Sequence, residues 1–401
     1  MASTTLTTAI RQRLSTFAAG VASPFSDSRR RDFVTTMLTG LVAGGRVHLT
    51  AIARAQHRGS ANIHAAEKKL SRHLKSEHWD AAPIAAELLR RSAARVTDDT
   101  LIVADTTDLA KSYARKLEGL GRVHDGSDPA GRITPGYCLF QAFVRVGAWQ
   151  LFPLVIEPLK VYAGASTSEN AEFLTHVLSV HEATQKKGTW VLDRGFDRRE
   201  LFGPLVNHEV AFVVRQRGDR TVRTTDGREV SVNTLVAEQG CPRPRRWPRG
   251  GVAVAVEVGL PEVGPDPFLL VVGWRVPGSD KPLVLLVSPA ARRPGRTAGW
   301  FVRAYHRRWG VEDAIRGIKQ HFAVEEFLVR TWRAIRRLVW LVAWAFWWLN
   351  LWGEEGFERL RTAVMTHPWR LAKTVTYLFD WIASMLRELL HPHPKLSLNT
   401  G

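Results

Sequence analysis

Two short apolar runs that each end in an aspartate constrain the fold of this chain most strongly. Residues 100–105 read Thr-Leu-Ile-Val-Ala-Asp, and residues 188–193 read Gly-Thr-Trp-Val-Leu-Asp. Apolar runs of this length are typical of strands that are buried on both faces of a sheet. Between them, residues 138–146 and 149–158 are β-rich runs joined by two small residues, which predicts a hairpin. The pair Ser166 and Glu169 then forms a capping-box pattern, so a helix is expected from there to about Lys187.

After the second run, the pattern continues with a helix, a strand and a segment of different character. Residues 198–207 are expected to form a helix, and residues 210–215 a strand. Residues 217–290 hold strand-like runs separated by turns rich in Gly, Pro and Arg, which indicates an all-β insertion. Helix resumes near Thr297 and is expected to continue to about Gln320 and on into a tryptophan-rich helix. This order predicts an α/β fold with an RNase H-like core that the insertion interrupts.

The first 97 residues are expected to be helical and basic. Apolar periodicity predicts helices near residues 29–43, 48–56, 63–74 and 81–96, and the last two carry clusters of basic side chains. Across the chain 56 Lys and Arg outnumber 38 Asp and Glu, a net charge of +18. So large a surplus implies a polyanionic partner, most simply DNA or RNA. Short basic helices in series suit a DNA-binding module of the helix-turn-helix kind, and the alternative is a helical bundle whose charged face is only solvated.

A tryptophan-rich segment raises the question of a membrane. Residues 338–352 read LVWLVAWAFWWLNLW, which is shorter than the about 20 residues that a membrane-spanning helix needs. Asn350 interrupts the run, and two glutamates follow it. We therefore expect a buried core helix here and no membrane association. The remaining tail is expected to be helical, and the apolar face of residues 378–390 suits packing or self-association.

These patterns divide the chain into five parts. They are a helical DNA-binding domain (1–97), the first part of the core (98–216), the β-rich insertion (217–290), the second part of the core (291–352) and a helical tail suited to dimerisation (353–401). The two cysteines, Cys138 and Cys241, lie far apart without the spacing of a zinc site, which favours a reducing compartment. The first residues show no signal-peptide pattern, so a cytoplasmic, nucleoid-associated protein is expected.

A stripe of residues at helical spacing supplies the first chemical signal. Tyr305, Arg308, Glu312 and Lys319 are spaced i, i+3, i+7 and i+14. On one α-helix with about 100° per residue, they would share a face roughly four turns long. A carboxylate can hold a metal ion, and the other three side chains can hold phosphates. The stripe therefore predicts metal-assisted chemistry on a nucleic-acid backbone.

Three carboxylates are the candidate metal ligands. Asp105 and Asp193 end the two apolar runs, which an RNase H-like sheet would place side by side, and the later helix supplies Glu312. Mg²⁺ prefers oxygen ligands, and two such ions about 3.5–4 Å apart can activate an attacking oxygen and stabilise the leaving one. Each residue alone fits an ordinary turn or helix-surface position, but the three in this order favour a metal site. Asp108 and Asp197 lie nearby and are expected in turn or capping roles.

With these residues in place, the chain resembles a known family. The helix follows the pattern Y-x2-R-x3-E-x6-K. The first aspartate lies in Ala-Asp105-Thr-Thr-Asp-Leu, followed by Leu-Glu-Gly-Leu-Gly-Arg-Val-His-Asp125-Gly-Ser, and the second lies in Val-Leu-Asp193-Arg-Gly-Phe-Asp, followed by Phe-Val-Val-Arg215. Over residues 30–350 these motifs resemble the bacterial insertion-sequence DDE transposases, in the branch that carries the YREK signature and excises DNA through hairpin ends.

The resemblance implies an activity and a set of roles. It implies cut-and-paste transposition by a dimer on paired element ends, with Mg²⁺ (or Mn²⁺ as a substitute) on the three carboxylates. DNA-binding roles would fall on Tyr305, Arg308, Lys319, Arg215, Arg194 and Trp309, the last as a stacking surface for a flipped base. The chain departs from the family in one place. Relatives can carry a tryptophan well before the signature tyrosine, where this chain has residues 281–287, and the nearest tryptophans are Trp274 and Trp300.

Two other functions fit the same pattern. A structure-selective Mg²⁺-dependent nuclease of the same fold would cut DNA without terminal repeats and would not join strands. A DNA-binding repressor derived from a transposase would bind the terminal inverted repeats without cutting them.

Overall fold

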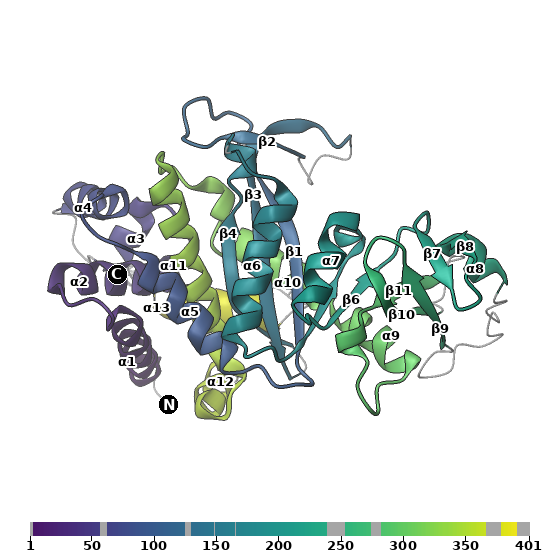
Figure 1. The fold of residues 1–401 in the computed structure, drawn as a ribbon. Coiled ribbons are helices and arrows are strands. Elements are labelled where there is room, and N and C mark those ends of the chain that lie inside the picture. The colour runs from purple at the N-terminus through teal and green to yellow at the C-terminus, as the bar shows by residue number, and fades with distance from the viewer. Residues whose placement is uncertain are drawn as a thin grey trace.

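A computed structural model describes most of the chain. The described residues are 3–56, 62–124, 130–147, 149–164, 166–238, 253–273, 282–365 and 378–390. Cys241, Trp274, Asp125 and the basic loop at 243–249 lie outside them. The fold mixes one large sheet with many helices, as the order of sequence patterns predicts (Figure 1).

The described strands form one continuous sheet of 11 strands. Their order across the sheet is β2-β3-β1-β5-β6-β11-β10-β9-β7-β8, and β4 pairs with β3. Strand β1 is antiparallel to β3 and parallel to β5, which is parallel to β6. The strands are β1 Leu101–Ala110, β2 Gly121–His124, β3 Ile133–Val146, β4 Gln150–Pro158, β5 Thr189–Leu192, β6 Phe212–Arg215, β7 Thr221–Thr224, β8 Glu229–Ser231, β9 Ala253–Leu260, β10 Gly264–Gly273 and β11 Leu283–Val287.

The first strand extends beyond its predicted end. It was expected to stop at Asp105, but it continues to Ala110 because it pairs with β3 along its whole length, from Leu101 opposite Arg145 to Ala110 opposite Gly136. The predicted hairpin is confirmed by the antiparallel pairing of β3 with β4. Asp105 therefore lies in the middle of a strand, whereas Asp193 directly follows the end of β5.

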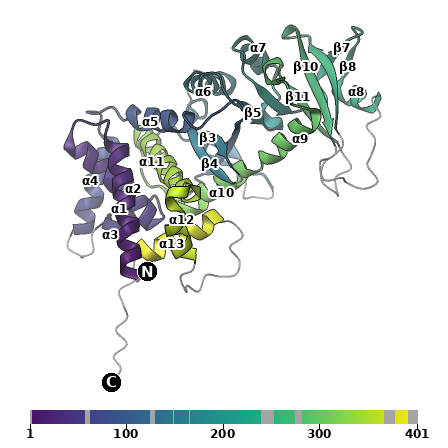
Figure 2. The ribbon, with the colours of Figure 1, turned by 90° about the horizontal axis from the view of Figure 1, so that it is seen from below.

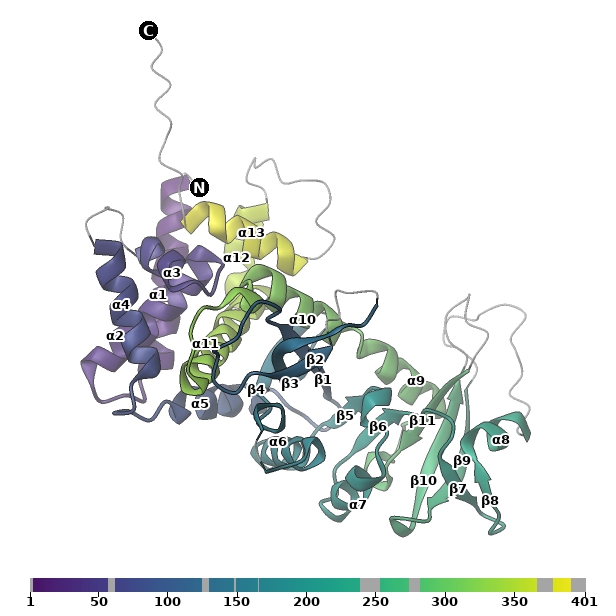
Figure 3. The ribbon, with the colours of Figure 1, turned by 90° about the horizontal axis from the view of Figure 1, so that it is seen from above.

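Helices cover the two faces of the central strands. On one face lie α6 (Glu169–Ala183) and α7 (Arg199–Asn207), and Phe140 of β3 meets Phe173 of α6 edge to face. On the other face lie α10 (Gly310–His321) and α11 (Trp332–Asn350), and Phe143 of β3 meets Phe346 of α11. Alternate residues of β3 thus face opposite layers, as the strand period requires. Figure 3 shows α10 and α6 on either side of β3.

Helix α6 differs from its prediction at both ends. Its N-cap is Ser168, whose side chain accepts a hydrogen bond from the amide of Ala171, rather than Ser166. The helix ends at Ala183, before the predicted Lys187. The reason is local, because Gln185 and Lys186 adopt positive φ angles of 55° and 61°, which cannot continue a right-handed helix.

The segment 217–290 carries helix as well as strand, so the prediction of an all-β insertion is wrong in this respect. Helix α8 (Val232–Glu238) follows β8, and the hydroxyl of Ser231 accepts from the amide of Thr234 at its start. The strands of this segment also continue the main sheet, since β11 pairs with β6. Helix α9 (Ala298–Arg307) packs on β9, β10 and β11 (Figure 2).

The single helix predicted from Thr297 into the tryptophan-rich run is three helices. Helix α9 ends at Arg307 and α10 begins at Gly310, and the turn between them has i→i−3 hydrogen bonds, from Arg308 N to Tyr305 O (3.0 Å) and from Val311 N to Arg308 O (2.8 Å). Gly310 lies so close to the sheet that an added Cβ would be 2.6 Å from Arg145 Nη1. A second break follows α10, where Ala323 has a φ of 48° before the short 3₁₀ turn Val324–Glu326 and α11.

The N-terminal helices gather around α11, and their predicted helical character is confirmed. They are α1 Ser3–Ala22, α2 Ser28–Gly44, α3 Leu49–Gln56, α4 Ile63–Lys75 and α5 Ala82–Ala93. In the tail, α12 (Glu358–Met365) and α13 (Leu378–Leu390) are helical, and α13 packs on α1, α2, α10 and α11 of the same chain. Its apolar face, including the buried Ile382 and Leu386, is thus covered within the chain.

Helix α11 is buried along nearly its whole length, which confirms the prediction of a core helix. The indole Nε1 of Trp344 donates to Ile84 O (2.8 Å), and that of Trp347 to the Ser92 hydroxyl (3.0 Å), both in α5. Among the described helices, none has the length and hydropathy that crossing a bilayer would require.

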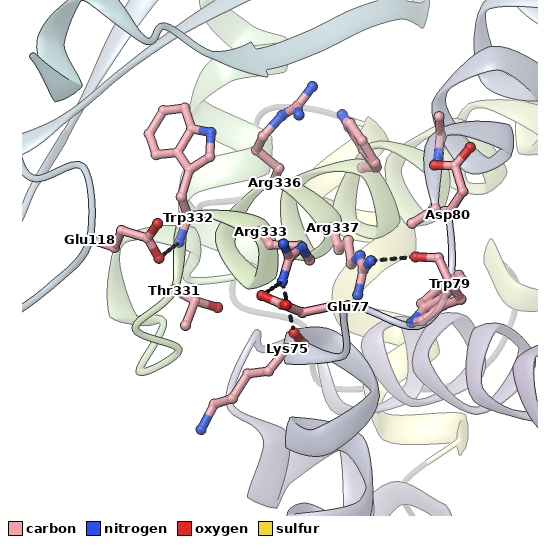
Figure 4. A pocket seen from close by; sticks show the side chains of 13 residues that line it. Lys75, Glu77, Trp79, Asp80, Glu118, Thr331, Trp332, Arg333, Arg336 and Arg337 are labelled. Atoms are coloured by element: carbon pink, nitrogen blue, oxygen red, sulfur yellow. Dashed lines mark hydrogen bonds and ion pairs between the residues drawn. The ribbon is translucent and has the colours of Figure 1, made fainter. Parts of the chain in front are cut away.

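Near its N-terminus, α11 also holds the end of α4. The buried guanidinium of Arg337 donates to the carbonyl oxygens of His73 (3.1 Å), Leu74 (3.0 Å), Ser76 (2.8 Å) and Trp79 (2.8 Å). Figure 4 shows the bond to Trp79. The acceptors include carbonyls that the last turn of α4 leaves without helical partners. Arg337 therefore joins the N-terminal helices to the core.

Candidate active site

Two of the three predicted carboxylates are held together by an arginine. The guanidinium of Arg308 donates from Nη1 to Asp105 Oδ2 (3.1 Å) and from Nη2 to Glu312 Oε1 (3.0 Å). Arg308 is only 7% exposed. Asp105 comes from β1 and Glu312 from the first turn of α10, so the ion pairs fasten that helix to the sheet. The sequence predicted this arginine as a phosphate contact, and in this structure it lies between two carboxylates.

Asp193 completes the acidic group. It follows β5, which is parallel to β1 over Leu101–Val103, and its Oδ1 accepts a hydrogen bond from the amide of Gly195 (2.7 Å). Burial and the nearby charge of Asp193 raise the pKa of Asp105 to about 6, although Arg308 acts in the opposite direction. For Arg308 itself, burial alone would lower the pKa, but Tyr305 and the three carboxylates raise it overall. Asp105 and Glu312 therefore share one buried cation, and Asp193 lies close enough for its charge to act on both Asp105 and Arg308.

A glutamine that the sequence analysis did not single out lies in the same region. Gln141 of β3 is directly opposite Asp105 in the antiparallel pair, so both side chains are on the same face of the sheet. It is 1% exposed, and its Oε1 has no hydrogen-bond partner within the described residues. A buried acceptor without a partner is costly. The sequence feature that could have pointed to Gln141 is that it is the one amide side chain in the apolar run Cys138–Val146.

Lys319 lies about two turns beyond Glu312 on α10, and its contacts in this structure are with protein groups rather than with the phosphates that the resemblance implied. Its Nζ donates to the backbone carbonyl of Asp108 and pairs with Glu325 Oε1 at 3.1 Å. The carboxyl of Asp108 contacts the Cys138 thiol on the α6 face, and burial raises its pKa. Asp197 is also structural, since it accepts from the Arg217 amide (2.9 Å) and pairs with Arg220 (2.6 Å). Neither aspartate joins the acidic group.

The remaining predicted residues differ in how far they are accessible. Tyr305 is buried, with its ring 5.6 Å from the Arg308 guanidinium carbon. Trp309, one residue beyond Arg308, is 52% exposed, and Arg194, one residue beyond Asp193, is exposed too. Arg215 is half-buried at the end of β6. Tyr305 could therefore touch DNA only after a local rearrangement, whereas Trp309 and Arg194 are already on the surface.

The side chains of the acidic group are oxygen donors, and Arg308 lies between two of them, Asp105 and Glu312. Carboxylate oxygens and the free carboxamide oxygen of Gln141 are the hard donors that Mg²⁺ prefers. Within the part of the chain that the structure describes, no three His, Cys, Asp or Glu side chains lie close enough together to hold one metal ion. The guanidinium of Arg308 forms ion pairs with two of the carboxylates, at 3.1 Å to Asp105 and 3.0 Å to Glu312.

A pocket of about 450 Å³ opens elsewhere, beside the N-terminus of α11. Figure 4 shows its cationic residues Lys75, Arg333, Arg336 and Arg337 together with Glu77, Asp80 and Glu118. Arg333 pairs with Glu77 (2.8 Å), and Glu118 accepts from the Trp332 amide (2.9 Å). Its charges are largely balanced, so it does not have the character of an anion site.

Comparison with known protein families matches part of this chain. Residues 159–348 match the family model described as "Transposase DDE domain". The match includes Asp193 and Glu312 and spans somewhat less than half of the chain, beginning after the strand that carries Asp105. It supports a DNA transposase of the DDE class, which is a class of nucleic-acid-cleaving enzymes.

Among the solved structures, the chain is similar to the piggyBac transposase in a synaptic complex with hairpin DNA. It has 10% sequence identity and a TM-score of 0.44, with 95% of this chain and 78% of that chain covered. No curated protein matches the sequence.

Proposed function

We propose that this protein is a DNA transposase that cuts the ends of an insertion sequence and transfers them into target DNA. The observation that carries the proposal is the convergence of Asp105, Asp193 and Glu312 around Arg308, from three separate elements. The DDE family match over the segment that supplies two of these residues supports it. The sheet order β4-β3-β1-β5-β6, with β1, β5 and β6 parallel, supports an RNase H-like core for this chemistry.

The three carboxylates would hold Mg²⁺, with Mn²⁺ as a substitute. A bound divalent ion would supply Lewis-acid activation of the attacking oxygen and stabilisation of the leaving oxygen. The residues fit because they are oxygen donors, and because Asp193 lies close enough to Asp105 that its charge, after burial, raises the pKa of Asp105. Arg308 would have to leave the carboxylates when the ion binds, and its guanidinium would then be available to a DNA phosphate.

Other residues of the chain would bind and orient the DNA. Trp309 and Arg194 are exposed beside Glu312 and Asp193, so they can reach a base and a phosphate at the cleaved end. The basic α4, with Lys68, Lys69 and Arg72, suits recognition of the terminal inverted repeats. Transposition of two ends also requires that they be held together, which a homodimer would do.

The proposal is tested by a cleavage assay with Mg²⁺ on a duplex that carries the inverted repeat flanking this gene. We expect the wild type to cut and Asp193→Asn or Glu312→Gln to lose cutting by more than about 100-fold, because each loses one ligand charge. End binding, measured by gel shift, should change little. Products that include DNA hairpins and joined strands would distinguish a transposase from a nuclease.

Asp313→Asn is the matched control for Glu312→Gln. Asp313 is the next residue on α10, but its carboxylate pairs with Arg316 (3.3 Å) on another side of the helix. This variant should cut as the wild type does. A wild-type protein that binds the repeat and never cuts it would contradict the proposal and favour a repressor.

A further inference from the structure

Three large hydrophobic side chains are exposed at the same end of the sheet, beyond the end of β1. Tyr113 is 99% exposed, Leu328 is 78% exposed and Ile133 is 53% exposed. Among the described residues the other large hydrophobic side chain of this kind is Trp309, at the candidate active site. Single exposed hydrophobic residues are normal on a protein surface, but a group of them marks a contact surface.

Backbone and side-chain contacts hold these three residues near one another. Lys111, two residues before Tyr113, donates from Nζ to the carbonyl of Phe327 (2.7 Å), next to Leu328. The amide of Lys111 donates to Pro135 O (2.7 Å), two residues after Ile133. The segments after β1, before the core of β3 and before α11 therefore meet here. In Figure 1 this end of the sheet carries β2 and projects from the body of the molecule.

The base of this projection is tightly packed, so the surface is preorganised. Gly136 of β3 lies between β1 and β2, and an added Cβ would be 2.5 Å from the carbonyl oxygen of Leu109. Tyr137 donates its hydroxyl to Glu118 O (2.8 Å), and the Glu118 amide donates to Arg330 O (2.9 Å). The loop that carries Tyr113 is thus fixed at both of its ends.

Positive charge surrounds the exposed apolar group. Arg115, Lys116, Arg122 and Arg330 are all exposed, and none forms an ion pair within the described residues. Two of the three neighbouring glutamates are paired with cations. Glu325 pairs with Lys319 (3.1 Å), Glu326 pairs with Arg46 (3.6 Å), and Glu118 accepts from the Trp332 amide. Exposed cations without ion pairs, in the same segments as an exposed aromatic side chain, suit nucleic acid, whereas two copies of this surface would repel each other.

We propose that Tyr113, Ile133 and Leu328, with Arg115, Lys116, Arg122 and Arg330, form a second DNA-contact surface, separate from the carboxylates. Tyr113 lies against a base or sugar, and the four cations lie along phosphates. The position of this contact on the DNA rests on the proposed function. Strand β1 rises about 3.3 Å per residue, so Lys111 lies about 20 Å along the strand from Asp105, which corresponds to about six base pairs of duplex.

DNA binding at this surface can be measured without knowing the terminal repeat. The probe is a fluorescein-labelled duplex of mixed sequence with a single-stranded 3′ tail, and fluorescence anisotropy is recorded over a salt series. Tyr113→Ala should weaken binding about 5- to 10-fold with an unchanged salt slope, because stacking is not ionic. Tyr113→Trp should retain wild-type affinity. The double variant Arg115→Ala/Lys116→Ala should reduce the slope of log K against log salt by about 1.5.

Lys186→Ala is the matched control. Lys186 is exposed and pairs with Glu209 (3.1 Å) just before β5, at the opposite end of the sheet. Its removal should leave affinity for the tailed duplex nearly unchanged. The proposal is overturned if Tyr113→Ala binds like the wild type, or if it changes sedimentation of the free protein instead, which would make this surface an interface between copies.

To measure where Tyr113 contacts the DNA relative to the cleavage site, the DNA must carry an end that the protein cuts. With Tyr113→p-benzoylphenylalanine, the photo-crosslink should lie about six base pairs from the nicked phosphate, and a crosslink at the nick itself would contradict the assigned distance. The two proposals fail separately. If the protein never cuts but the Tyr113 series behaves as expected, only the transposase function is lost. If it cuts and Tyr113→Ala binds normally, only the second surface is lost.

Discussion

At the scale of single residues, Arg308 is the residue on which the candidate site depends most. It is the buried counter-ion of Asp105 and Glu312, so Arg308→Met should leave these carboxylates uncompensated. Asp105 has a pKa of about 6, raised from 3.8, so it is protonated in the folded state at pH 5 and charged at pH 8. The loss of stability should therefore be larger at pH 8, about 2 kcal/mol or more, than at pH 5.

Thermal unfolding at the two pH values, with and without Mg²⁺, checks this expectation. At pH 8, Mg²⁺ should raise the Tm of Arg308→Met more than that of the wild type, because the ion takes the place of the guanidinium. An equal loss of stability at both pH values would show that Asp105 is not the group that Arg308 compensates.

At the scale of elements, Arg337 of α11 caps the C-terminal end of α4 by hydrogen bonding to its carbonyl groups. Arg337→Leu removes donors from four carbonyl groups, two of them buried, and should destabilise the protein by about 3 kcal/mol. Arg333→Ala, one turn earlier, removes an exposed pair with Glu77 and should cost less than about 1 kcal/mol. Chemical denaturation of the two variants gives both values, and similar losses would contradict the capping role.

At the scale of the whole molecule, the N-terminal helices and the sheet should unfold as one unit. Phe17 of α1 stacks on Trp347 of α11, and Val47, after α2, donates from its amide to Phe322 O (2.8 Å), beyond α10. Tryptophan fluorescence and far-ultraviolet circular dichroism should therefore report the same thermal transition, because most of α11 is buried between these parts. Two separated transitions would mean that residues 1–97 form an independent domain.

Much of this architecture could be predicted from sequence because the signals are local. Apolar runs gave the core strands, periodicity gave the N-terminal helices, and the length of residues 338–352 separated a core helix from a membrane span. The sequence also singled out Asp105, Asp193 and Glu312, since each follows or lies within a recognisable element, and their catalytic role stays a prediction. Element ends were less accurate, as at Asp105, because strand pairing with β3 extends β1 beyond its apolar run.

The amino-acid sequence by itself determined the order of the elements and the chemistry of the acidic residues, because burial and backbone preference act over a few neighbouring positions. Tertiary structure alone decided which side chains those residues contact. The turn at Arg308 and Trp309 between α9 and α10 carries i→i−3 hydrogen bonds, and Arg308 lies there between two carboxylates. The exposed group around Tyr113 exists because three segments, distant in sequence, converge beyond β1. Such contacts depend on packing between residues that are far apart in sequence, and local sequence patterns do not predict this packing.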